Sequence, residues 1–364
     1  MSRYWMLPED IIELLPDNAA LVEKVRREFL DNVATWGYQL VIPPLAEFLD
    51  SLLAGSENLD LQTFKITDQQ SGRMMGVRAD ITPQIARIDA HRLPTDEVSR
   101  FAYCGEVLRT RSESIQPRRN PLIAGAELYG VPAVSGDIEI MALLLDCIEQ
   151  FAITDSVLDI GHSGIFSGLV EVYQLNGEQR RQLKSALSGL KRPEIALWAE
   201  STAYSSNYLE DVQFLLDSPL NDGDLKAFKE RFYHRHPLFN RAIDELEIAF
   251  STLSKFFPQQ DLKIDFASVG NYGYHSGLLF ALYAEGHYDA IARGGRYDGL
   301  GEVYGRARAA TGFSIDLLTL CQLLTPVSTP CLEMTPLPQT AEAFAEIKRQ
   351  RCQGKAIGFQ HRDE

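Results

Sequence analysis

The chain has 364 residues, of which 45% are hydrophobic, and its formal net charge is −15 at pH 7. The length and apolar content predict a globular protein of about two domains with a sizeable core, and the acidic balance disfavours nucleic acid as a partner. No run of about 18 apolar residues indicates a membrane span, and no apolar signal-peptide core is seen, so we expect a cytoplasmic protein with reduced thiols.

Helical and strand patterns alternate along the first 150 residues. A helix is predicted over residues 18–36, where apolar residues recur at helical spacing between Pro16 and Gly37. A strand over residues 38–42 follows it. A further helix over residues 138–151 carries apolar residues nearly all round, which predicts that it is buried.

Asp80 lies in a predicted turn between a strand and a helix. Met74 and Met75 mark the strand, while Thr82 is predicted to cap the helix and Pro83 to occupy its first position. A carboxylate in such a turn can accept charge-assisted hydrogen bonds from the ammonium group of a bound amino acid. The alternative for this segment alone is a capped surface helix with a solvated aspartate.

Two predicted strands, residues 99–109 and 122–129, enclose a loop rich in arginine. The loop arginines are Arg109, Arg111, Arg118 and Arg119. Because guanidinium groups match phosphate oxygens bidentately, this loop is a candidate phosphate clamp. A solvated hairpin tip is the common alternative.

Residues 165–257 form a different region, rich in helix formers with polar breaks, and predict a helical insertion. His234 and His236 lie in it, but the sequence offers no third or fourth ligand nearby, so a metal site is not expected. His162, just before this region, has no evident partner in the sequence.

Strands are predicted again over residues 262–267, 278–283 and 289–292. Tyr272, Tyr274 and His275 stand among small residues, a composition that suits a pocket for a flat ring with polar edges. The fold class that follows is α+β, with an antiparallel sheet flanked by helices and interrupted by a helical insertion.

Taken in order, these segments resemble the class II aminoacyl-tRNA synthetases, and specifically the catalytic module of histidyl-tRNA synthetase, over about residues 1–320. Residues 38–44 resemble the first motif of that class, which builds its dimer interface. Arg109 stands where the second motif has the arginine that holds the ATP α-phosphate, and Glu127 stands at a histidine-binding position. Residues 294–300, Gly-Gly-Arg-Tyr-Asp-Gly-Leu, match the histidine-pocket loop of the family.

The departures from this family concern activation of the amino acid. Gly270 and Thr319 occupy positions where the synthetases have arginines that act on the adenylate and on ATP, and Pro121 and Ile123 replace a phenylalanine and a glutamine of the second motif. Losing one preorganised electrostatic contact typically costs about a hundredfold to a thousandfold in rate. We therefore expect a chain without catalytic activity of its own.

This combination resembles the family of ATP phosphoribosyltransferase regulatory subunits, which are paralogues of histidyl-tRNA synthetase. The resemblance implies a partner, the short catalytic subunit of the first step of histidine biosynthesis, and feedback inhibition by L-histidine. It also implies homodimers within a hetero-octamer, no cofactor and no metal, with tRNA an unexpected ligand. The implied effector-binding residues are Asp80, Thr82, Arg109, Glu127, Tyr272, Tyr274 and His275.

The implied organisation has four parts. Residues 1–164 and 258–322 form the two halves of a synthetase-like core, residues 165–257 form the helical insertion, and residues 323–364 form a short extension without an anticodon-binding domain. Three alternatives stay open: a truncated synthetase-like ligase acting on a target other than tRNA, an RNA-binding paralogue, and a structural dimer with an empty pocket.

Overall fold

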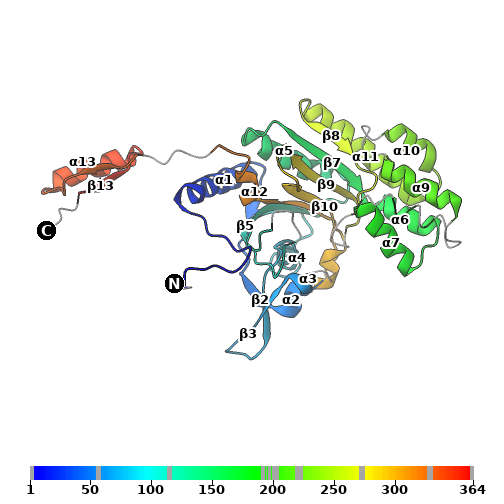
Figure 1. The fold of residues 1–364 in the computed structure, drawn as a ribbon, viewed down its shortest axis with the longest axis horizontal. Helices are drawn as coiled ribbons and strands as arrows, with labels where there is room; N and C mark the ends of the chain where they lie inside the picture. Colours follow the sequence, from blue (N-terminus) through cyan, green and yellow to red (C-terminus); the bar gives the residue numbers. More distant parts are fainter. Residues whose placement is uncertain are drawn as a thin grey trace.

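An eight-stranded sheet forms the centre of the protein, as seen in a computed structural model (Figure 1). Its strand order is β1-β5-β6-β11-β10-β9-β7-β8. The β1–β5 and β7–β8 pairs at the two edges are parallel, and the five pairs between them are antiparallel. The structure describes residues 4–54, 59–112, 117–189, 193, 195, 198, 205–217, 224–269, 275–325 and 331–360.

Most of the strands are short, and the helices lie between them in the chain. The strands are β1 (Gln39–Leu40), β2 (Ala46–Phe48), β3 (Phe64–Thr67), β4 (Met74–Val77), β5 (Ser99–Glu106), β6 (Leu122–Tyr129), β7 (Ser156–His162), β8 (Asp261–Ile264), β9 (Leu278–Ala284), β10 (Ala292–Arg296), β11 (Ala310–Asp316), β12 (Glu333–Thr335) and β13 (Ile357–Phe359). The helices are α1 (Pro16–Thr35), α2 (Leu49–Leu53), α3 (Leu59–Gln62), α4 (Thr82–His91), α5 (Val134–Gln150), α6 (Ser163–Val172), α7 (Gly177–Ser188), α9 (Ser206–Asp217), α10 (Leu225–Phe232), α11 (Pro237–Phe256), α12 (Leu317–Cys321), α13 (Ala341–Cys352) and the 3-10 helix η2 (Leu300–Tyr304).

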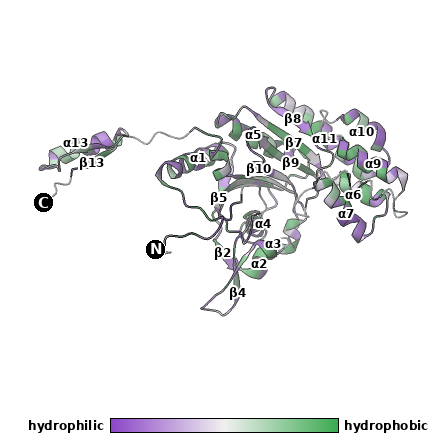
Figure 2. Cartoon of the chain, in the orientation of Figure 1, coloured by the Kyte–Doolittle hydropathy of each residue, from purple (hydrophilic) through white to green (hydrophobic). Residues whose placement is uncertain are grey.

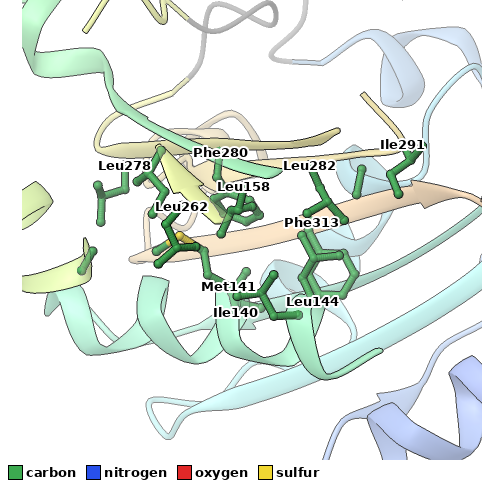
Figure 3. Packing of buried hydrophobic residues seen from close by; sticks show 14 of the residues in the cluster. Ile140, Met141, Leu144, Leu158, Leu262, Leu278, Phe280, Leu282, Ile291 and Phe313 are labelled. Carbon is green, nitrogen blue, oxygen red and sulfur yellow. The ribbon is translucent and has the colours of Figure 1, made fainter. Parts of the chain in front are cut away.

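The main hydrophobic core lies between this sheet and helix α5. Figure 3 shows Ile140, Met141 and Leu144 of α5 packed against residues of several strands, among them Leu158 of β7 and Phe313 of β11. All five side chains are almost completely buried. Burying a large apolar side chain contributes about 1.5–3 kcal/mol to folding. The sequence prediction of a buried helix here is confirmed, although α5 begins four residues earlier than expected, at Val134.

A second, smaller core occupies the opposite face of the sheet. Ile81 and Ile85 from the α4 region pack there against Tyr103 of β5 and Tyr297, which follows β10. Alternate residues of a strand point to opposite faces. On β6, for example, Ala126 faces the α5 side, and its neighbour Glu127 faces the α4 side. The cavity described below opens on this second face.

The described residues between β7 and β8 are mainly helical. Figure 1 shows α6, α7, α9, α10 and α11 gathered at one end of the sheet, and α9 and α10 alternate hydrophilic and hydrophobic residues, as amphipathic helices do (Figure 2). Helix α11 contacts α5, β7 and β8. This helical region therefore shares the main core with the sheet.

Two further units lie outside the central sheet. Strands β2, β4 and β3 form a small antiparallel sheet. Near the end of the chain, β12 and β13 pair in parallel and are joined by α13, a helix that buries none of its residues. Figure 1 shows this last unit apart from the main body.

The predicted fold class, α+β with a mostly antiparallel sheet flanked by helices, is confirmed. Two local predictions were wrong. Thr82 does not cap α4, because its hydroxyl donates to Glu127 instead. The strand expected at residues 289–292 lies over Ala292–Arg296. Position 294 in that strand requires glycine, because a Cβ there would lie 2.2 Å from the Phe280 ring and 2.4 Å from the carbonyl oxygen of Gly312.

Candidate functional site

A cavity of about 400 Å³ opens on the α4 face of the central sheet. Its floor is formed by β10, β11 and β9, and Asp80, Thr82 and Glu127 line it on one side. Its volume falls in the range of about 300–1,000 Å³ typical of small-molecule pockets. These three lining residues, together with His275, are residues that the sequence predicted as ligand contacts.

Glu127 is the buried anchor of this cavity. Its side chain is 1% exposed. Oε1 accepts a hydrogen bond from the Thr82 hydroxyl at 2.8 Å, and Oε2 accepts a short one from the Tyr297 hydroxyl. Burial raises the pKa of this carboxyl from 4.5 to about 8, although the hydroxyls of Tyr297 and Thr82 act in the opposite direction. A ligand that brings a positive charge or an N–H donor would stabilise the ionised form.

Glycine makes room beside that carboxylate. Gly312 of β11 is the Cα partner of Glu127 and also of Gly295 on β10. A Cβ at Gly312 would lie 1.7 Å from Glu127 Oε2. The floor next to Glu127 therefore lacks side chains, which leaves space for a ligand against the backbone.

Asp80 lies at the end of the turn between β4 and α4, as predicted. Its Oδ1 accepts a hydrogen bond from the Ile81 backbone N–H at 2.7 Å. Burial raises its pKa, and the nearby positive charge of Arg109 lowers it. Arg109 itself does not line the cavity. Its Nε donates a hydrogen bond to the carbonyl oxygen of Ala79 at 3.2 Å. Arg109 thus acts on this site through its charge.

His275 also lines the cavity. Burial lowers its pKa to about 4, and the charge of Lys184 acts in the same direction, so the imidazole is neutral near pH 7. The other two predicted aromatic contacts, Tyr272 and Tyr274, lie outside the described residues.

Two further carboxylates, which the sequence reasoning missed, line the far end of the cavity. Asp159 lies on β7, and Asp265 follows β8. Burial raises the pKa of Asp159 to about 6, and the charge of Asp265 contributes to this shift. The alternation of Asp159 with the apolar residues Leu158 and Ile160 along β7 was the available signal. Nothing in the local sequence of Asp265 indicates that β8 lies beside β7.

The arginine-rich loop that the sequence suggested as a phosphate clamp is largely engaged by the protein itself. Arg118 Nη1 lies 3.1 Å from Asp316 Oδ2 and 3.4 Å from Thr319 Oγ1. Arg119 donates to the backbone carbonyl oxygens of Arg109 and Glu9. Arg111 is exposed. Arg118, the arginine beside Thr319, is therefore already paired with a carboxylate.

The Gly-Gly-Arg-Tyr-Asp loop divides between the two faces of the sheet. Tyr297 points into the cavity side, whereas Arg296 is 1% exposed on the other face and donates to Asp137 Oδ2 at 2.7 Å. His162, which showed no partner in the sequence, has two: Nδ1 accepts from the Gly164 N–H and Nε2 lies 2.9 Å from Glu245. The contacts of Arg296 and His162 stabilise the fold around the cavity.

Within the described ranges, no group of three or more His, Cys, Asp or Glu side chains is arranged to hold a metal ion. Across the same ranges, no helix combines the length and the apolar character needed to cross a bilayer.

Comparisons with known proteins place this chain in a family. Residues 10–320 match the family model described as histidyl-tRNA synthetase. The chain is 39% identical, over 98% of its length and 92% of the relative's, to an ATP phosphoribosyltransferase regulatory subunit from Marinomonas sp. (strain MWYL1). It is 42% identical to the protein of the same name from Methylococcus capsulatus, over 88% of this chain and 79% of that one. The chain belongs to the family of ATP phosphoribosyltransferase regulatory subunits.

A solved structure agrees at the level of the fold. A protein from Bacillus halodurans C, described as an ATP phosphoribosyltransferase regulatory subunit/histidyl-tRNA synthetase, superposes with a TM-score of 0.88 at 22% identity. The match covers 99% of this chain and 93% of that one. The resemblance to ATP phosphoribosyltransferase regulatory subunits that the motif series predicted is thus confirmed, and the synthetase-like architecture with it. The individual ligand contacts stay predictions.

Proposed function

We propose that this chain is the non-catalytic regulatory subunit of an ATP phosphoribosyltransferase assembly and binds L-histidine in the cavity beside Glu127. It activates a short catalytic subunit and makes that subunit sensitive to histidine. The observation that carries the proposal is the buried Glu127, held by Thr82 and Tyr297 at one end of a cavity, in a chain of this family.

The chemistry of the cavity suits an amino acid with a basic ring. Asp80 and Glu127 supply carboxylates for an ammonium group and for an imidazole N–H. Because Gly312 has no side chain, a flat ring can lie against the backbone of β11. The other predicted contacts are Arg109, which acts through Asp80, His275 on the cavity wall, and Tyr272 and Tyr274, assigned from the sequence alone.

The ATP side of a synthetase site is altered in ways that favour a regulatory role. Gly270 and Thr319 replace two arginines expected of an activating enzyme. The hydroxyl of Thr319 donates to Asp316, which also pairs with Arg118. A cation already paired with a carboxylate offers little stabilisation to the pentavalent phosphate of an adenylation step.

Histidine can inhibit at a distance only if it binds two states of the assembly with different affinity. We propose homodimers of this chain within a hetero-octamer. The exposed apolar side chains at and after the edge strand β1 support a dimer surface there, since Leu40 and Ile42 are 50% and 77% exposed. An edge strand with exposed apolar groups is normally covered by a partner.

The test mixes the purified chain with a short catalytic subunit from the same source and follows phosphoribosyl-ATP formation with and without histidine. The expected result is a faster reaction that histidine inhibits. In the Asp80→Asn variant the activation persists and the histidine sensitivity falls at least about tenfold, because charge-assisted bonds to the ammonium are lost. Asp31→Asn, on the exposed side of α1, serves as the matched control.

The competing ligase function makes a different prediction. If the chain leaves the catalytic subunit unchanged and supports amino-acid-dependent pyrophosphate exchange by itself, the regulatory proposal is wrong. If activation occurs without any response to histidine, the regulatory role stands and the effector assignment fails. A salt-dependent titration with tRNA tests the RNA-binding alternative.

A further inference from the structure

Arg293 is the feature of this cavity that neither the motif comparison nor the proposed contacts explain. It lies on β10 immediately before the Gly-Gly-Arg-Tyr-Asp loop, and its half-buried side chain lines the cavity. No hydrogen bond or ion pair joins its guanidinium to any other described residue. Asp159, Asp265, Asp80 and Glu127 line the same cavity as carboxylates.

The strand register fixes where Arg293 stands relative to Glu127. Arg293 pairs with Ser314 of β11, which pairs in turn with Gly125 of β6. Gly125 and Glu127 are two residues apart, so both they and Arg293 face the same side of the sheet. Two strand spacings and a two-residue step separate the Cα atoms of Glu127 and Arg293 by about 12 Å. Both side chains line the cavity above that interval, which one small zwitterion can bridge.

The charged groups around Arg293 leave its guanidinium available to a ligand. The groups that act on the Asp159 carboxyl are Asp265, Lys263 and Asp261. Lys184 is close enough to lower the pKa of His275 but does not line the cavity. Among the described lining residues, Arg293 is therefore the one permanent cation, set into a wall of carboxylates and neutral groups.

We propose that Arg293 recognises the carboxylate of the bound amino acid, so that the cavity selects a free acid over the corresponding amine or alcohol. The inference rests on the proposed histidine binding. In this arrangement the ligand's positive groups meet Glu127 and Asp80, and its carboxylate meets the guanidinium fork. The cation that position 270 lacks is supplied in this chain from β10. A ligand without an acid group leaves Arg293 partly buried and unpaired, which is unfavourable.

The experiment compares L-histidine with L-histidinol, which carries a hydroxymethyl group in place of the carboxylate. Binding of each to the full chain is measured by isothermal titration calorimetry. The wild-type protein is expected to bind histidine at least about tenfold more tightly than histidinol. In Arg293→Gln, histidine binding weakens at least about tenfold while histidinol binding changes less than about threefold, and Arg293→Lys lies between them.

Lys184→Gln is the matched control, because it removes a nearby cation that does not line the cavity, and it is expected to keep the preference for histidine. Thermal unfolding of each variant reports on its fold. Equal weakening of both ligands in Arg293→Gln, or equal binding of both by the wild type, overturns the role of Arg293 alone. Absence of binding of either ligand to the wild type overturns both the proposed effector and this inference.

Discussion

The hydroxyl of Thr82 lies 2.8 Å from Glu127 Oε1 and joins the first turn of α4 to the middle of β6 across the cavity wall. The same hydroxyl lies 3.3 Å from the Tyr103 hydroxyl. A residue that the sequence marked as a helix cap is thus used to hold a buried carboxyl in place. The start of α4 needs no such cap, because Pro83 has no N–H and the Gln84 N–H donates to the Ile81 carbonyl oxygen at 2.9 Å.

Replacing Thr82 by Val keeps its shape and removes the donor. We expect the free energy of unfolding to fall by about 1–3 kcal/mol, because Glu127 loses one of its hydroxyl partners in a buried site. Histidine affinity should fall at least about tenfold as the carboxylate becomes free to turn. Thr82→Ser, which keeps the hydroxyl, should stay within about threefold of the wild type. Urea unfolding and calorimetric titration measure the two effects, and a Val variant equal to Ser would contradict the role of the bond.

Glu127 is expected to make the protein less stable as the pH rises. Its pKa is about 8 in the folded chain and near 4.5 in the unfolded chain. Between these values the folded chain binds the additional proton, so its contribution is complete below pH 4.5 and is lost as the pH rises through about 8. One proton corresponds to a slope of up to about 1.4 kcal/mol per pH unit.

Glu127→Gln removes this titration and should flatten the dependence. Urea unfolding of both proteins between about pH 5 and pH 8 checks the prediction, with the difference between the two curves isolating Glu127 from groups such as Asp159. Parallel curves for the two proteins would show that the carboxyl titrates normally in the folded chain.

Local patterns predicted the elements that depend on local chemistry. Both boundaries of strand β6 were predicted correctly, and α1 differs from its prediction by two residues at the start and one at the end. The spacing of apolar residues, with Pro16 and Gly37 as start and stop signals, suffices to predict such an element. The turn that carries Asp80 was placed correctly for the same reason.

The other half of the cavity depends on long-range pairing that no local signal contains. Asp159 and Asp265 meet because β7 and β8 pair in parallel although residues 163–260 separate them in the chain. The face occupied by Arg293 follows from the exact pairing of β10 with β11, and the glycines that interrupt this strand hid its register from a pattern search. The motif series predicted Asp80, Thr82, Glu127 and His275, which line one cavity, but the direction of each side chain required the sheet.

Arg296 and Arg293 lie three residues apart on one strand, and substituting them is predicted to change the free energy of unfolding by very different amounts. Arg296 pairs with Asp137, and each side chain of the pair is 1% exposed. Arg296→Met leaves a buried carboxylate without its partner and should lower the free energy of unfolding by about 3–5 kcal/mol. Arg293→Met, which breaks no ion pair among the described residues, should change it by less than about 1 kcal/mol. Urea unfolding distinguishes the two, and similar losses in both variants would contradict the assignment of Arg296 to the framework and Arg293 to the ligand.

The space beside Glu127 can be tested with a single methyl group. At Gly312 a Cβ would lie 1.7 Å from Glu127 Oε2 and 2.7 Å from the Ala126 carbonyl oxygen. Gly312→Ala must therefore displace the carboxylate into the cavity, at a cost of about 1–3 kcal/mol in unfolding free energy and at least about tenfold in histidine affinity. Gly299→Ala is the matched control, since a Cβ there meets nothing within 4 Å. It should change stability by less than about 0.5 kcal/mol and leave histidine binding unchanged. Full histidine affinity in Gly312→Ala would show that the ligand does not lie against β11, because the added methyl group and the displaced carboxylate would occupy that space.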